Sequence, residues 1–206
     1  IRAALYLLLF ALWGYSLDCR IIQTQALHCM RLTAALMLVW LVLRTLKYEV
    51  VTDITVARYI WYLYYLPMLF IPLFGVYIAL SLGKSEKYSL TGRVVALAAI
   101  PAILFSLVIT NDLHQQVFRF LMEPPYSDEN YHYGKIFFVI QLWIIVCLAA
   151  MEVILVFKSR IPGRKQFWLP IIPGILLLGW NICNILRVPF ILSIAGVMTA
   201  VCCLLI

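Results

Sequence analysis

Residues 59–82 read YIWYLYYLPMLFIPLFGVYIALSL and contain no charged side chain. As an α-helix rising about 1.5 Å per residue, this stretch is long enough to cross the hydrocarbon core of a bilayer, which is about 30 Å thick. Pro67 and Pro72 predict kinks, and a packed bundle of membrane helices tolerates them. The stretch therefore predicts a membrane-spanning helix.

The rest of the chain has the same character. Its 206 residues are 65% hydrophobic and 12% charged, whereas an ordinary soluble domain carries about 25% charged residues. This composition excludes a soluble fold. The net charge of +7 is typical of cytoplasmic loops rich in Lys and Arg that lie near anionic lipid headgroups. We therefore expect the bilayer as a partner and no nucleic acid. The six cysteines lack C-x-x-C spacing, which argues against a metal site or a disulfide framework.

Further apolar runs extend the prediction to an all-α integral membrane protein, a seven-transmembrane helix bundle forming one domain over residues 1–206. Residues 167–206 are too long for one crossing, and Arg187 and Pro189 mark the expected turn. The chain stops within an apolar run, so we expect it to be a piece of a longer protein. The seven predicted spans are residues 3–17, 26–46, 59–82, 94–109, 136–157, 167–186 and 188–206.

Lysine and arginine in the loops predict the orientation, because cytoplasmic loops are enriched in both. The linkers after the third and fifth spans are rich in them, whereas the long loop after the fourth span has only Arg119 and Lys135. We therefore expect the long loop and the N-terminus outside and the C-terminus in the cytoplasm. The loop after the second span, with Arg44, Lys47 and Arg58, favours the opposite orientation. The cations of the two basic linkers are Lys84, Lys87, Arg93, Lys158, Arg160, Arg164 and Lys165.

Several polar residues lie within predicted spans or at their ends. A charged group at the centre of a membrane helix costs about 2.5–3.5 kcal/mol, so such residues should face the bundle or a wet cavity. One interpretation is a ligand pocket open to the outside. The other is that the amides only join helices, at about 0.6 kcal/mol per bond, while Asp112 and His114 lie in water. The candidate ligand-binding residues are Asn111, Asp112, His114, Gln141, Asn181 and Asn184.

Trp61 is a further candidate, because it lies in an aromatic run that either anchors the helix at the membrane surface or lines a ligand site. Glu152, near the cytoplasmic end of the fifth span, is expected to pair with Lys158 or Arg160. His28 falls at the opposite membrane face from His114 and His132, so it cannot share a haem with either, and only a His114–His132 pair stays open. We expect no cofactor, no metal and, since no catalytic motif is present, no enzymatic activity in this segment.

The chain resembles the seven-helix sensor region at the N-terminus of certain bacterial histidine kinases. The resemblance rests on residues 61–68 with Pro72, on residues 82–84, and above all on residues 107–115, LVITNDLHQ. It implies a multi-pass plasma-membrane sensory domain that detects an unknown small ligand or membrane signal. It further implies a C-terminal cytoplasmic output domain and a homodimer of the full-length protein. The rival is a small transporter or permease, but no internal repeat is visible.

Overall fold

A computed structural model describes residues 8, 11–17, 23–85, 89–120, 131–158 and 179, and these are mostly helical. Residues 11–17 are helical and precede the elements that have defined bounds. Those elements are α2 (Thr24–Thr45), a π-helical turn (Leu46–Val50), α3 (Ile54–Leu63), α4 (Tyr65–Ser81), α5 (Gly92–Val95), a 3-10 turn (Ala96–Ala98), α6 (Ala99–Ile109), α7 (Asn111–His114), β1 (Phe118–Phe120), β2 (Tyr131–Tyr133) and α8 (Lys135–Lys158).

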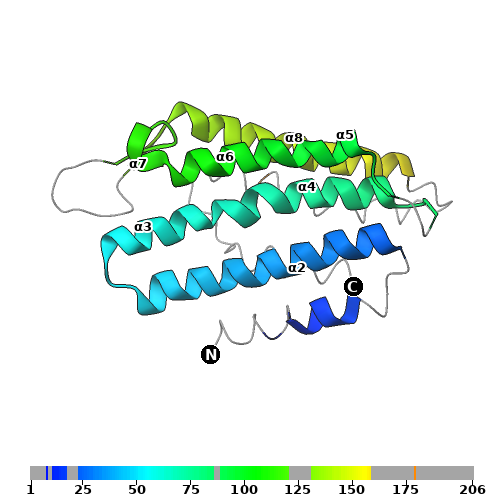
Figure 1. Cartoon of the computed structure of the whole chain (residues 1–206), viewed down its shortest axis with the longest axis horizontal. Coiled ribbons are helices and arrows are strands. Elements are labelled where there is room, and N and C mark those ends of the chain that lie inside the picture. The colour runs from blue at the N-terminus through cyan, green and yellow to red at the C-terminus, as the bar shows by residue number, and fades with distance from the viewer. Residues whose placement is uncertain are drawn as a thin grey trace.

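The long helices lie side by side, and α4 packs against both α2 and α8 (Figure 1). One end of the bundle contains the π-helical turn, α7 and the two strands, and we call it the hairpin end. The opposite end contains the start of α2 and the ends of α4 and α8. At that end the Gln23 side-chain amide donates to the Ser85 carbonyl across 3.5 Å. The chain therefore crosses repeatedly between two distinct ends, as a membrane bundle requires.

Three helices are long and apolar enough to cross a membrane by length and composition: Thr24–Val50, Ile54–Ser81 and Lys135–Lys158. They agree with the second, third and fifth predicted spans. The predicted span at 94–109 corresponds to the shorter apolar helix Ala96–Ile109. The spans predicted at 167–186 and 188–206 lie outside the described residues, Gly179 excepted, and the first span is described only in part.

Two breaks in the helices follow from proline, which has no N–H to donate to the carbonyl four residues earlier. Pro67 lacks the bond to Leu63, where α3 ends, and at Tyr64 the N–H bonds instead to the Trp61 carbonyl at 3.1 Å. Pro101 likewise has no N–H for the carbonyl of Leu97, which lies in the 3-10 turn Ala96–Ala98. Pro72, by contrast, lies inside α4. The prediction of a distortion at Pro67 is thus confirmed.

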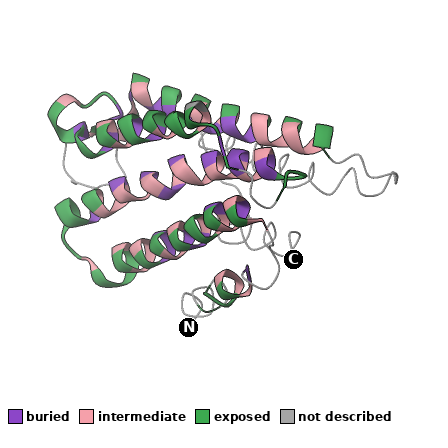
Figure 2. Cartoon of the chain, turned by 45° about the vertical axis from the view of Figure 1, so that its right-hand side comes forward, coloured by how far each residue is buried: buried purple, intermediate pink, exposed green. Residues whose placement is uncertain are grey.

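The largest buried cluster lies toward the hairpin end, where α3, α4, α6, β1 and α8 meet. Tyr62, Val108, Phe118 and Ile140 are all 0% exposed there. The outward faces of the helices are apolar as well as exposed (Figure 2): Ile103, for example, is 61% exposed. A surface of this kind is typical of helices that face lipid.

The all-α prediction is wrong in one respect, because β1 and β2 form an antiparallel hairpin. Its register pairs Phe118 with Tyr133, Arg119 with His132 and Phe120 with Tyr131. Aromatic and polar residues alternate along each strand, so the rings lie on one face and the charged groups on the other. The aromatic face packs on the bundle: Phe118 is buried, whereas Arg119 and His132 are exposed.

Candidate functional site

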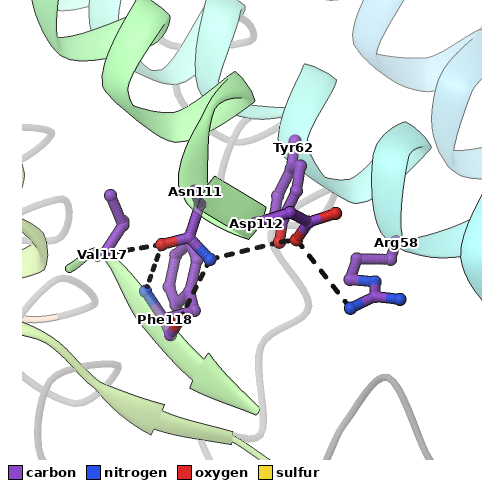
Figure 3. Close-up of polar contacts among 6 residues, drawn as sticks. All are labelled: Arg58, Tyr62, Asn111, Asp112, Val117 and Phe118. Atoms are coloured by element: carbon purple, nitrogen blue, oxygen red, sulfur yellow. Dashed lines mark hydrogen bonds and ion pairs between the residues drawn. The ribbon is translucent and has the colours of Figure 1, made fainter. Parts of the chain in front are cut away.

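Asn111, the first residue of α7, holds the hairpin against the helices (Figure 3). Its side chain is 0% exposed. The Oδ1 atom accepts from the backbone N–H groups of Val117 and Phe118, both at 3.0 Å, and Nδ2 donates to the Phe118 carbonyl at 2.9 Å. Nδ2 also donates to the Tyr62 hydroxyl at 3.2 Å. A side-chain amide has two donors and two principal acceptor sites, so the chain itself satisfies Asn111 completely.

A tight chain reversal makes this arrangement possible. Gln115 ends α7 in the left-handed region, with φ 50°, and its N–H donates to the Asn111 carbonyl at 2.7 Å. The reversal places Val117 beside Asn111, and the Gly134 N–H donates to the Val117 carbonyl at 2.8 Å. A Cβ at Gly134 would lie 1.9 Å from the Gln116 carbonyl oxygen. Glycine is therefore required at the base of the hairpin.

Asp112 connects α7 to α3. The Tyr62 hydroxyl donates to its Oδ1 across 2.7 Å, and Arg58 Nη1 lies 3.8 Å from the same oxygen (Figure 3). Tyr62 is buried completely, but the Asp112 and Arg58 side chains keep 30% and 26% of their surface exposed. Asp112 and Arg58 are thus the charged, partly accessible members of the cluster, whereas Asn111 and Tyr62 form its buried part.

His114 closes the end of α7 and uses both ring nitrogens to do so. Its Nδ1 accepts from the Gln116 backbone N–H at 3.0 Å, which places the proton on Nε2. Nε2 then donates to the Leu107 carbonyl at 3.1 Å and lies 3.4 Å from the Thr110 hydroxyl. The histidine therefore stabilises the junction between α6 and α7.

These contacts join residues of the segment that resembles histidine-kinase sensor regions. A match to a known protein family points to the same region of these kinases. The family model described as the N-terminal 7TM region of histidine kinase matches residues 2–206. The chain belongs to this family. No curated protein and no solved structure matches it.

In this 7TM region, Trp61 belongs to an aromatic cluster on the hairpin. Its ring centroid lies 4.5 Å from that of Phe118, 4.9 Å from Tyr131 and 6.5 Å from Phe120. Lys47 Nζ lies 5.8 Å from the Trp61 ring. Trp61 thus contacts both strands, although its ring remains partly exposed.

The structure brings Asn111, Asp112, His114 and Trp61 together at the hairpin end. Gln141 lies on the buried face of α8, at 3% exposure, and its Nε2 has no hydrogen-bond partner among the described residues. None of the described hydrogen bonds links it to Asn111. The predicted site residues Asn181 and Asn184 lie outside the described part of the chain.

The expected ion pair between Glu152 and Lys158 is wrong. Lys158 Nζ instead donates to the carbonyls of Ala79 and Leu82, both at 2.9 Å, and to that of Leu80. The carbonyls at the C-terminus of a helix lack intrahelical donors and attract a cation, so α4 competes successfully for the ammonium. Glu152 Oε2 is buried without a hydrogen-bond partner in the described part of the 7TM region. Arg160 lies outside the described residues.

Tyr62 and Arg58 also belong to the cluster around Asp112, and neither was predicted as a site residue from the sequence. Tyr62 lay within the aromatic run, but only its contacts distinguish it from its neighbours. Arg58 was counted as a loop cation, whereas α3 begins earlier, after Asp53, whose carboxylate accepts from the N–H groups of Thr55 and Val56 at 2.7 and 3.1 Å. An aspartate at this position is a common helix start, and this signal could have placed Arg58 on the helix.

Proposed function

We propose that this chain is the membrane-embedded sensory input domain of a bacterial histidine-kinase-type signalling protein. It forms a seven-span bundle in the plasma membrane, with the N-terminus and the hairpin end outside and the C-terminus in the cytoplasm. A small ligand or a membrane condition acts on the hairpin end, and the last span passes the change to a C-terminal cytoplasmic output domain. The full-length protein acts as a homodimer.

The observation that carries this proposal is the family match over residues 2–206, together with the position of the polar cluster. Arg58, Tyr62, Asn111 and Asp112 connect α3, α7 and the hairpin at one end of the bundle. Lys84 and Lys158, from the two basic linkers, lie at the opposite end. The positive-inside rule favours a cytoplasmic location for that end, which leaves the polar cluster outside.

The mechanism we propose is a shift between two packings of the bundle. A stimulus that prefers one packing changes their populations by its differential affinity, and such coupling is typically about 1–3 kcal/mol. Asn111 and His114 use their hydrogen-bonding groups within the protein, so their role is to hold the hairpin in place. Asp112 and Trp61 keep exposed surface beside them and make the first contact with the stimulus. Gln141, Asn181 and Asn184 are the further candidate ligand-binding residues.

Signalling by the full-length parent in a reporter strain tests the function. Asp112→Asn keeps the shape of the side chain and its contact with Tyr62 but removes the charge, so we expect an inserted protein with nearly unchanged melting in detergent and an altered response. Tyr48→Phe, on the exposed π-helical turn, is the matched control. A normal response from Asp112→Asn would exclude Asp112 from detection.

Cysteine labelling tests the orientation separately. In a background without the six native cysteines, a cysteine at Ser127 should react with an impermeant thiol reagent in intact cells. Cysteines at Ser85 and Ser159 should react only after the cells are opened. The reverse pattern would invert the proposed topology.

A further inference from the structure

The guanidinium of Arg58 is half-buried and has few hydrogen-bond partners among the described residues. Its side chain is 26% exposed, and its Nε is buried without a hydrogen-bond partner among the described residues. The carboxylate of Asp112 lies 3.8 Å from Nη1, which exceeds hydrogen-bond distance. The described neighbours of the guanidinium include this carboxylate and the ring of Phe120, whose centroid lies 4.9 Å from Cζ.

Burying such a cation costs free energy, because a guanidinium has five N–H donors and burial removes the water molecules that would accept from them. A carboxylate that accepts two parallel hydrogen bonds is the usual partner of a buried arginine. Asp112 does not take this role in the structure, because its Oδ1 lies 3.8 Å from Arg58 Nη1 and accepts from the Tyr62 hydroxyl at 2.7 Å instead. The donors of Arg58 therefore suit a second carboxylate.

The surroundings of Arg58 add an apolar preference. Phe120, Trp61 and Tyr131 are partly exposed, and their ring centroids lie 4.9–6.5 Å from one another. Lys47 lies over Trp61 on the same aromatic group, so among the described residues the cations at this group are Lys47 and Arg58, and Asp112 is a nearby carboxylate. A patch of this composition favours a ligand with a negative charge and a flat apolar body.

We propose that Arg58 is the anion-recognising residue of a binding site at the hairpin end, and that the ligand is a small carboxylate bearing a flat apolar group, such as an aromatic acid. The ligand carboxylate accepts hydrogen bonds from the guanidinium, and its ring packs against Phe120 and Trp61. This inference rests on the proposed sensory function, for which it specifies the class of stimulus.

Because Asp112 lies beside Arg58, the proposal predicts that substitutions of the two residues change ligand binding in opposite directions. If Arg58 served only as the structural partner of Asp112, removing either charge would leave the other unpaired, and both changes would act alike. In the proposed site, Asp112 competes with the ligand for the same cation. Asp112→Asn should therefore strengthen carboxylate binding, whereas Arg58→Gln should weaken it.

Equilibrium dialysis of radiolabelled benzoate against the full chain in lipid nanodiscs tests this proposal, with empty nanodiscs to subtract partitioning into lipid. We expect saturable binding that Arg58→Gln weakens at least about tenfold, the typical effect of losing a charged hydrogen bond. Arg119→Gln, which removes an exposed cation from the same hairpin, should leave binding unchanged. Acetate, which lacks the ring, and benzyl alcohol, which lacks the charge, should compete at least about tenfold less well.

Benzoate binding that survives Arg58→Gln, or that Asp112→Asn weakens, would overturn the site. Absence of saturable benzoate binding would overturn the ligand class but leave the sensory function standing, because the reporter strain judges that function without benzoate. Conversely, intact benzoate binding in a parent protein that fails to signal would contradict the sensory function and retain the site. Circular dichroism of each variant identifies any that fails to fold, and Arg58→Lys, which keeps the charge but loses the planar fork, then replaces Arg58→Gln.

Discussion

The hydroxyl of Tyr62 and the carboxylate of Asp112 lie 2.7 Å apart, although the two residues are 50 positions apart in the sequence. The same hydroxyl accepts a hydrogen bond from Asn111. One buried phenol thus connects α3 to two consecutive residues of α7, and the position of the hairpin relative to α3 depends on it.

Removing this hydroxyl should loosen the hairpin end. Tyr62→Phe keeps the ring in the buried cluster but leaves the Asn111 amide without one acceptor, which costs about 1–3 kcal/mol. We expect a lower melting temperature in detergent, measured by size-exclusion chromatography of heated samples. Tyr48→Phe removes a hydroxyl from an exposed tyrosine at the same end and should melt as the wild type does. Equal melting of the two variants would contradict the role of Tyr62.

The amide of Asn111 should control the exchange of the first backbone N–H groups of the hairpin. Asn111→Ala removes the acceptor of the Val117 and Phe118 N–H groups and leaves both without a side-chain partner. Hydrogen exchange followed by mass spectrometry should show faster exchange in the peptide containing residues 117–120, with little change in α2. Asn111→Asp, which keeps the acceptor but loses both donors, should protect these N–H groups better than Asn111→Ala does. Unchanged exchange in both variants would show that the strand is held by other contacts.

A side chain at Gly134 should separate the two ends of the hairpin. In Gly134→Ala the new Cβ would lie 1.9 Å from the Gln116 carbonyl oxygen, a backbone atom that cannot rotate away. We expect a loss of about 1–3 kcal/mol, the usual cost of overpacking, seen as a lower melting temperature. Gly92→Ala, where a Cβ would meet nothing within 4 Å, provides the control. A wild-type melting temperature for Gly134→Ala would contradict the close approach.

The ammonium of Lys158 should stabilise the C-terminal end of α4. Lys158→Met keeps a long apolar stem but removes the charge from the carbonyls of Ala79, Leu80 and Leu82. A cation at a helix C-terminus contributes about 0.3–1 kcal/mol, so the melting temperature should fall by a few degrees. Lys135→Met, at the first turn of the same helix, removes a cation from the unfavourable end of the dipole and should cause no such fall. Equal effects of the two substitutions would attribute the loss to net charge alone.

The helices were predictable because long runs with almost no charge are typical of membrane spans: residues 59–82 contain no charged side chain, and residues 136–157 contain only Glu152. The hairpin was missed because FRF and YHY are too short for alternation to stand out, and ten residues separate them in the sequence. The stretch at Asn111 stays a predicted site, and the partners of its side chains were not predicted. Val117 and Phe118 reach Asn111 only through the left-handed turn at Gln115, and nothing in the local pattern predicts that turn. Arg58 was missed for a related reason, since the contacts of a cation with Asp112 and Phe120 arise from distant parts of the chain.

The close approach of Gly75 to Met151 limits how α4 and α8 can move. A Cβ at Gly75 would lie 2.7 Å from the Met151 sulfur, so α4 and α8 pack closely there and a larger residue would make the methionine side chain move. Sliding by one residue would shift α8 by about 1.5 Å, which would drive the thioether toward bulkier neighbours and draw Lys158 away from the α4 carbonyls. Axial displacement between these two helices is therefore opposed at two levels of the bundle. We therefore expect relative motion that conveys a stimulus to take place mainly along the other faces of this pair.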